Sequence, residues 1–183
     1  MPDLARAARI RLLVLDVDGV LTDNGIYLGV VDGRRVEFKR FDIQDGLGLA
    51  LLRGTGVEVA WLSARPSEAT VLRAEELRIP TCIQDPRGRK LPVLTGLLAD
   101  RGLTWEEVGF VGDDLADLAV LKRVGWAVAV ANATAEVKAV AHWVTEAAGG
   151  HGAVREVVET LLRARGEYDT ALARYLDDRD DAA

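Results

Sequence analysis

The sequence predicts an α/β fold, a doubly wound parallel sheet with helices on both faces, from three observations. Short apolar runs alternate along the chain with segments whose apolar residues recur at helical spacing. The first run, residues 11–17 (RLLVLDV), is apolar until acidic residues end it, which is typical of a buried parallel strand. The 183 residues match the length of one domain, so we expect a single domain over residues 1–183.

Five strands and five helices are predicted in alternating order. The strands cover residues 11–17, 57–62, 81–83, 108–111 and 126–130. The helices cover about residues 46–53, 67–77, 90–101, 115–123 and 153–164. Thr104 and Glu107 have the spacing of a capping box and predict one helical turn before the fourth strand.

Residues 25–41 break this alternation, because two strand patterns flank Asp32-Gly33, a strong hairpin-turn signal. The predicted hairpin is a flap inserted after the first strand, where a short loop would suffice. Isolated two-stranded hairpins are marginally stable in water. We therefore expect this flap to pack against a second subunit.

The composition is that of a globular protein, with 49% hydrophobic and 28% charged residues. Cys82 is the single cysteine, which excludes an internal disulfide and fits a reducing cytoplasm. The longest uncharged stretch has 12 residues, fewer than the ~18 of a membrane span. The unbroken apolar run that precedes Asp16 has only four residues, 12–15, too few for a signal peptide. A cytoplasmic location without membrane contact is expected.

The net charge of −6 is concentrated in an acidic C-terminal tail, residues 166–183. The tail carries −4, leaving −2 on the rest of the chain. Its charged residues are Glu167, Asp169, Arg174, Asp177, Asp178, Arg179, Asp180 and Asp181. No basic face is predicted, so nucleic acid is excluded as a partner.

Asp16 and Asp18 are the first candidate site residues, because they end the first predicted strand. Residues two apart point to the same side of a strand, and ~3.3 Å per residue places the two carboxylates ~7 Å apart or closer. Ligands of open α/β sheets bind at the carboxyl ends of strands. The non-catalytic alternative is that Asp16 and Asp18 are two solvated acids at a strand end.

Three further signals follow later predicted strands in the same way. Ser63 directly follows the second strand, Lys90 opens a helix, and the block Gly112-Asp-Asp-Leu-Ala-Asp117 follows the fourth strand. Each also has a non-catalytic explanation: Ser63 could cap a helix, Lys90 could be a solvated surface lysine, and the acids of the block could favour a helix N-terminus. Occurring in this order at strand ends, they favour a shared site.

Together these segments resemble the four motifs of the haloacid dehalogenase-like (HAD) phosphohydrolases. The resemblance extends, over about residues 11–166, to the capless 3-deoxy-manno-octulosonate 8-phosphate (KDO 8-phosphate) phosphatase group. It rests on LDVDGVLTD, the hairpin in place of a cap domain, FDIQDGLG, VGDDLADL and GGHGAVREV. The resemblance implies a Rossmann-like HAD fold and a phosphomonoesterase.

The resemblance also implies a role for each motif residue. Asp16 would be the nucleophile that forms an aspartyl-phosphate, and Asp18 the general acid and base. Ser63 and Lys90 would hold the phosphoryl oxygens. The implied cofactor is Mg²⁺, held by the Asp16 carboxylate, the Asp18 carbonyl and the Asp113 carboxylate. Asp114 and Asp117 would orient Lys90 or the metal waters, or cap the helix.

The implied substrate is a small phosphorylated sugar acid, KDO 8-phosphate or a related compound. Its contacts would be Asp18, Asp42, Gln44, Asp45, Gly46, Arg65, Arg73 and Lys90. Three positions depart from the group: Gln44 stands where members often carry Arg, and Ala50 and His151 replace usually basic residues. Fewer cations would weaken charge-assisted hydrogen bonds to a carboxylate.

The main alternatives belong to other functional classes. A receiver signalling domain also uses acids, Mg²⁺, a Ser/Thr and a Lys, but in a different order along the chain. No G-x-G-x-x-G or P-loop signature follows any strand, which excludes a nucleotide-binding dehydrogenase. A HAD phosphatase of other or broad substrate range and a non-catalytic HAD-like assembly module remain open.

The resemblance further implies a homotetramer. The hairpins would pack around the symmetry axis and bury Ile26, Leu28, Val36 and Phe38. The segment after Gly149 is expected to reach the adjacent active site.

Overall fold

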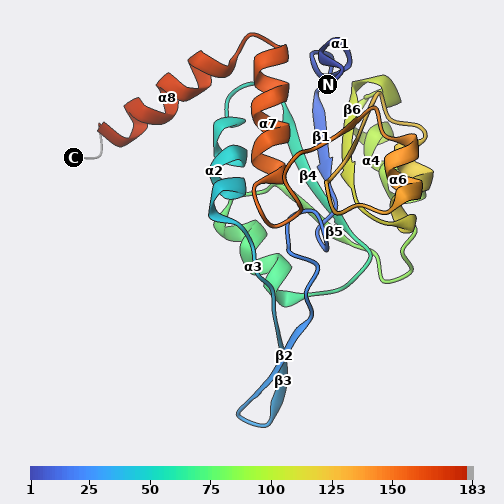
Figure 1. Cartoon of the computed structure of the whole chain (residues 1–183). Helices are drawn as coiled ribbons and strands as arrows, with labels where there is room; N and C mark the ends of the chain where they lie inside the picture. Colours follow the sequence, from blue (N-terminus) through green and yellow to red (C-terminus); the bar gives the residue numbers. More distant parts are fainter. Residues whose placement is uncertain (181–183) are drawn as a thin grey trace.

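The computed structural model, which describes residues 1–180, contains a six-stranded parallel sheet between two layers of helices (Figure 1). The sheet order is β5-β4-β1-β6-β7-β8. Its strands are β1 (Leu12–Leu15), β4 (Glu58–Ser63), β5 (Thr81–Gln84), β6 (Val108–Gly112), β7 (Trp126–Ala129) and β8 (Trp143–Val144). The chain runs outward from β1 in one direction and then returns to β6 on its other side. This reversal creates the crevice in which doubly wound sheets bind ligands.

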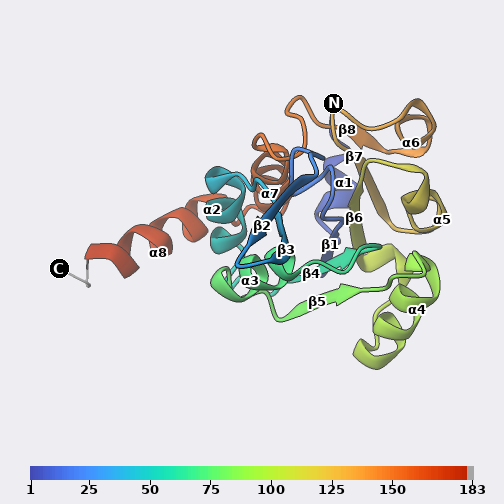
Figure 2. The same ribbon diagram turned by 90° about the horizontal axis from the view of Figure 1, so that it is seen from below.

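The helices divide between the two faces of the sheet. Figure 2 shows α2 (Ile43–Leu51), α3 (Glu68–Glu76) and α7 (Ala153–Ala164) on one side and α4 (Lys90–Arg101), α5 (Leu118–Leu121) and α6 (Ala135–Val140) on the other. The shorter elements are α1 (Leu4–Ala7) and the 3₁₀ turns η1 (Trp105–Glu107) and η2 (Leu115–Asp117). The predicted α/β class and helix layers are confirmed.

Strand β1 is buried along its whole length, as its apolar run predicts. Helix α7 buries one face, formed by Val154, Val157, Val158, Leu161 and Leu162. That face packs with α2 over the sheet (Figure 1). The sheet and α7 therefore form a rigid support for side chains that follow the strands.

Several predicted bounds were wrong. The apolar run 11–17 forms a strand only over β1. Helix α2 starts three residues before the predicted residue 46, because the Asp42 side chain accepts a hydrogen bond from Gln44 N at 2.7 Å and caps the helix. The helix expected over 115–123 is instead η2 followed by α5. Elements α1, α6 and β8 were not predicted.

The acidic tail is not an extended segment over its described part. Residues Tyr168–Asp180 form helix α8, which leaves the body after α7 (Figure 1). Ala171 is buried, and Arg174 donates to the carbonyl oxygens of Leu51 and Gly54 at the end of α2. Asp181 lies outside the described residues.

The hairpin is confirmed as β2 (Tyr27–Val31) paired with β3 (Arg34–Phe38). Asp32 and Gly33 both adopt positive φ angles, 50° and 76°, as a type I′ turn requires. The hairpin projects from the body, with Leu28 75% and Phe38 56% exposed (Figure 1). Its base lies beside the carboxyl ends of β1 and β4.

Within residues 1–180, no helix has the length and apolar character needed to cross a bilayer.

Candidate active site

Asp16 lies at the crevice of the sheet, directly after β1. Its backbone N–H donates to Val111 O in β6 at 3.0 Å, which fixes it beside the end of that strand. Its carboxylate pairs with Lys90 Nζ at 2.6 Å. Lys90 begins α4, as predicted, and its side chain is buried between Asp16 and Asp117, each at 2.6 Å. The structure thus brings the first and third motifs into direct contact.

Asp113 and Asp117 complete a buried acidic cluster. Asp117 Oδ2 accepts hydrogen bonds from the backbone N–H groups of Asp113 at 3.1 Å and Asp114 at 3.4 Å. This arrangement leaves Asp117 engaged by Lys90 and by the backbone. Asp114 and Asp117 were each predicted either to orient Lys90 or to cap the helix. In the structure Asp117 contacts Lys90, whereas the exposed Asp114 caps η2 by accepting a hydrogen bond from Leu115 N.

The electrostatics of the cluster favour an added cation. Burial and the neighbouring Asp117 carboxylate raise the pKa of Asp16 well above its usual value. The same two causes raise the pKa of Asp113 to about 7. Burial acts to lower the pKa of Lys90, but the Asp16 and Asp117 carboxylates outweigh it and raise that pKa. One lysine cation therefore does not neutralise the three carboxylates.

The donor set of this cluster fits a divalent metal ion. Asp16, Asp113 and Asp117 each offer a carboxylate oxygen, and these atoms lie within 4.8 Å of one another. Carboxylate oxygens suit hard cations such as Mg²⁺. Both Asp117 oxygens are already engaged, Oδ1 by Lys90 and Oδ2 by the backbone N–H groups of Asp113 and Asp114, so Asp16 and Asp113 are the better placed donors.

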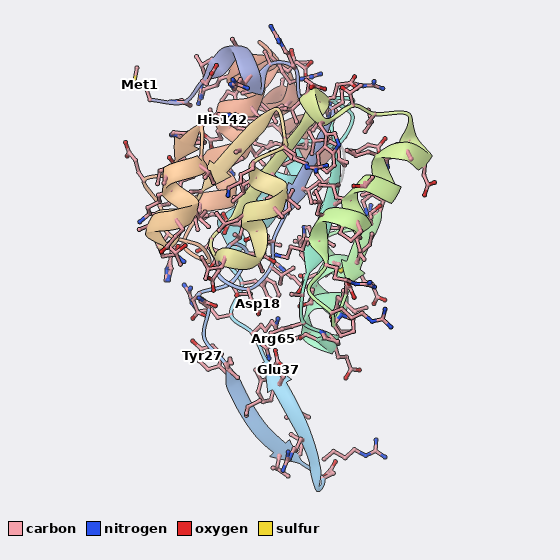
Figure 3. All side chains as sticks on the ribbon, turned by 90° about the vertical axis from the view of Figure 1, so that its right-hand side faces the viewer. Met1, Asp18, Tyr27, Glu37, Arg65 and His142 are labelled. Atoms are coloured by element: carbon pink, nitrogen blue, oxygen red, sulfur yellow. The ribbon has the colours of Figure 1, made fainter. Side chains whose placement is uncertain are left out.

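Asp18 points to the other side of the site, toward the hairpin and β4 (Figure 3). Its carboxylate accepts from Lys39 Nζ at 2.6 Å and from Ser63 Oγ at 3.5 Å. Arg65 lies at 3.7 Å from it. Asp16 therefore pairs with Lys90 and Asp18 with Lys39, so the two carboxylates have different surroundings.

The loop after Asp18 is clamped by two glycine contacts. Gly19 adopts a φ of +90°, and a Cβ at this position would overlap the Asp113 carboxylate. A Cβ at Gly149 would overlap the backbone of Gly19. Asn132 bridges the two loops, donating to Gly19 O at 3.1 Å and accepting from Gly149 N at 2.6 Å. The GGHG segment at Gly149–Gly150 therefore supports the site of its own chain.

The site cavity has a volume of about 240 Å³. It is lined by Asp16, Asp18, Asn24, Ile26, Ala64, Arg65, Lys90, Asp113, Asp114, Ala116 and Asp117. The predicted contacts Asp42, Gln44, Asp45, Gly46 and Arg73 do not line this cavity within one chain.

These five residues instead lie at the start of α2 or, in the case of Arg73, against it. Asp42 caps α2, and Gln44 is exposed. Asp45 is buried and accepts from Arg155 N at 2.8 Å. Arg73 lies over the Phe41 ring, donates to Asp42 O, and would be 2.8 Å from a Cβ at Gly46.

The other departures from the family pattern also lie outside the cavity. His151 is exposed, with its Nδ1 3.5 Å from the Arg40 guanidinium, which donates to Gly150 O. Ala50 faces Arg53 and Tyr175 beside α8.

Sequence reasoning missed several residues that contact the candidate site residues, among them Glu37, which pairs with Arg65. Lys39 pairs with Asp18 although its side chain is only 1% exposed, and Asn132 holds the Gly19 loop. The alternation of the hairpin could have indicated Lys39, because Glu37 and Lys39 are two residues apart on a strand pattern and share a face. No sequence signal marks Asn132.

Asp45 supplies a testable pH dependence of stability. Burial raises the pKa of Asp45 from 3.8 to about 6. The folded state therefore binds the proton more tightly than the unfolded chain, so stability falls as pH rises from about 4 through 6. One pKa unit corresponds to about 1.4 kcal/mol, which limits the loss to about 3 kcal/mol. We expect Asp45→Asn to flatten the slope of Tm between pH 4 and 7 relative to the wild type.

The control is Asp100→Asn, at an exposed position of α4, which lies on the other face of the sheet from α2 and Asp45. This variant should keep the wild-type slope. Parallel Tm profiles for wild type and Asp45→Asn would show that Asp45 does not hold a proton in the folded protein.

Comparisons with known proteins identify sequences and structures that this chain resembles. A family model of haloacid dehalogenase-like hydrolases matches residues 81–157. The chain is 41% identical over 168 residues to the 3-deoxy-D-manno-octulosonate 8-phosphate phosphatase KdsC of Escherichia coli, covering 92% of this chain and 87% of that protein.

Solved structures resemble the whole fold. One is the 3-deoxy-D-manno-octulosonate 8-phosphate phosphatase of Moraxella catarrhalis in complex with magnesium, phosphate and KDO. Its TM-score is 0.87 at 36% identity, covering 94% of this chain and 97% of that one. The cobalt-bound phosphatase of Haemophilus influenzae matches with a TM-score of 0.82 at 32% identity, covering 89% and 93%.

Proposed function

The chain belongs to the KDO 8-phosphate phosphatase family of haloacid dehalogenase-like hydrolases and is a phosphatase, and we propose that it hydrolyses KDO 8-phosphate or a closely related phosphorylated sugar acid. The observation that carries the proposal is the contact of Asp16 with Lys90 beside Asp113, with Asp18 held separately by Lys39. A nucleophile and a proton-transfer group need such different surroundings.

In the proposed reaction, an Asp16 oxygen attacks phosphorus and forms an aspartyl-phosphate while the bond to the sugar oxygen breaks. Asp18 gives a proton to that oxygen, and the free sugar leaves. Asp18 then takes a proton from water as the water attacks phosphorus, which releases phosphate and restores Asp16. Lys90 and Ser63 stabilise the charge on the phosphoryl oxygens.

Mg²⁺ is the proposed cofactor, held by the carboxylates of Asp16 and Asp113 and by the Asp18 carbonyl. When bound, it offsets the repulsion between the Asp16 carboxylate and the phosphate dianion. The raised pKa values of Asp16 and Asp113 support this role, because burial and the Asp117 carboxylate disfavour negative charges that a bound cation would stabilise. Asp117 positions Lys90 within the same cluster.

The substrate class is supported by the relatives and by Arg65 at the edge of the cavity. A planar guanidinium binds a carboxylate through two parallel hydrogen bonds. Asp42, Gln44, Asp45, Gly46 and Arg73, which lie outside the cavity of one chain, are proposed to shape the substrate site through α2 and α3. The departures at Gln44, Ala50 and His151 make a related sugar acid the alternative substrate.

The direct test is phosphate release from a panel of phosphorylated sugars and nonulosonates in the presence of Mg²⁺. We expect the highest kcat/KM for KDO 8-phosphate or another 2-keto sugar-acid phosphate. A preference for neutral sugar phosphates would instead identify a HAD phosphatase of different range. No turnover of any ester would favour the non-catalytic assembly module.

We further propose a cytoplasmic homotetramer assembled through the hairpins. The cytoplasmic location is supported by the single cysteine, and the assembly by the exposed apolar residues of the hairpin. Ile26 is 63% exposed and Leu28 75%, and burying such side chains stabilises an interface by about 25 cal/mol per Å².

Light scattering should therefore give four times the chain mass. Leu28→Lys should lower that mass, whereas Arg34→Lys near the hairpin tip should not. A wild-type monomer that is fully active at nanomolar concentration contradicts the assembly.

A further inference from the structure

The surroundings of Arg65 differ from those of an open substrate-binding arginine. Its guanidinium pairs with Glu37 of strand β3, with Nη2 3.1 Å from Oε2. The same carboxylate accepts from Ser67 Oγ at 3.4 Å and lies 3.7 Å from Lys39 Nζ. Figure 3 shows Arg65 between Asp18 and Glu37. Glu37 thus receives the arginine, lysine and hydroxyl contacts that an external carboxylate would use.

The two acidic and two basic side chains around Arg65 balance each other's charge without a ligand. Asp18 and Glu37 are opposed by Lys39 and Arg65, and Lys39 is held tightly by Asp18 at 2.6 Å. A substrate carboxylate at Arg65 would leave one uncompensated negative charge. The balance is restored if Glu37 leaves Arg65 when the substrate enters.

The Arg65–Glu37 pair also lies between two cavities. The site cavity, which includes Asp18 and Arg65, has about 240 Å³, below the roughly 300–1,000 Å³ of ordinary ligand pockets. On the other side, a groove between β3 and α3 has about 700 Å³ and includes Glu37, Lys39 and Phe41. Arg65 lines the first space and Glu37 the second, so the ion pair connects the linings of the two cavities.

We propose that Glu37 is an internal competitor that occupies Arg65 in the free enzyme and is displaced by the carboxylate of the substrate. The inference rests on the proposed function and makes Glu37 a specificity-determining residue. A substrate with a second anionic group compensates for the broken Arg65–Glu37 pair, whereas a simple phosphate ester leaves the pair in place. The Glu37 side chain is 21% exposed, so it has solvent to turn into.

The experiment compares KM for KDO 8-phosphate and for p-nitrophenyl phosphate, which lacks a carboxylate. Glu37→Gln keeps the shape of the side chain and removes its charge. It should lower KM for KDO 8-phosphate about two- to fivefold, as expected for a partly exposed ion pair, and leave KM for p-nitrophenyl phosphate unchanged. Arg65→Ala should raise KM for KDO 8-phosphate about ten- to hundredfold.

The double variant provides the decisive comparison. If Glu37 acts by occupying Arg65, Glu37→Gln should have no further effect in the Arg65→Ala background. Glu68→Gln is the matched control, since it removes a carboxylate three residues after Arg65 that forms no ion pair with the described residues. It should leave the ratio of the two KM values unchanged. Glu37→Asp, which keeps the charge on a shorter side chain, should give an intermediate KM.

Binding provides a readout without turnover. Calorimetric titration of free KDO into the chelator-treated protein should show tighter binding to Glu37→Gln than to wild type, with unchanged Tm. The proposal is overturned if Glu37→Gln raises KM for KDO 8-phosphate, if Glu68→Gln lowers it equally, or if the Glu37→Gln effect persists without Arg65. Failure of the wild type to release phosphate from either ester would contradict the proposed function itself, not the competitor.

Discussion

Replacing Asp16 with Asn is expected to reduce phosphatase turnover by ~10⁴-fold or more while leaving the fold intact. Loss of a nucleophile has effects of this order in enzymes that form covalent intermediates. The amide is nearly isosteric with the carboxyl group but is a poor nucleophile. Because burial already raises the pKa of Asp16, an uncharged side chain costs the folded state little, and Tm should be equal or higher.

The matched control is Asp100→Asn, on the exposed face of α4, the helix that begins with Lys90. It should retain wild-type kcat. Acid-quenched wild type should carry a phosphoryl group detectable by mass spectrometry, and Asp16→Asn should not. Substantial turnover by a folded Asp16→Asn protein would rule out the aspartyl-phosphate mechanism.

The contacts among Asp16, Lys90, Asp113 and Asp117 could be predicted as a cluster because each motif follows a parallel strand. Parallel strands that share a sheet end at one edge, so a spacing pattern along the chain becomes a spatial cluster. The buried strand β1 could also be predicted, because a continuous apolar run bounded by acids indicates a buried strand. Helix α7 could be predicted as well, because apolar residues at helical spacing indicate a helix with one buried face.

The remaining features depend on tertiary packing that leaves no local pattern. Asp45 looks like a solvent-facing acid in the FDIQDGLG segment, but packing of α2 against α7 buries it under the N-terminus of α7. Helix α8 has weak amphipathicity and many acids, and only its contacts with the end of α2 show where it lies. Lys39 reaches Asp18 because it follows β3 at the base of the hairpin, beside the end of β1, and no periodicity specifies this placement.

Metal removal is the second change expected to abolish turnover. Excess chelator should reduce activity to background, and added Mg²⁺ should restore it, because the phosphate dianion cannot otherwise approach the carboxylates of Asp16 and Asp113. Activity that persists in excess chelator would contradict the metal role of both residues.

The same cluster predicts how Mg²⁺ binding depends on pH. In the metal-free protein the pKa of Asp113 is raised to about 7, so folding favours the protonated group and stability falls as pH rises from about 4 through 7. Metal ligands must lose their protons, so Mg²⁺ should bind more tightly at pH 8 than at pH 6. The Mg²⁺-induced rise in Tm should therefore be larger at pH 8.

Asp113→Asn should remove this rise and Asp114→Asn should keep it, because only Asp113 belongs to the buried cluster. An equal rise at both pH values would mean that the metal binds outside the cluster, and the charge imbalance among Asp16, Asp113, Asp117 and Lys90 would then need another counter-ion.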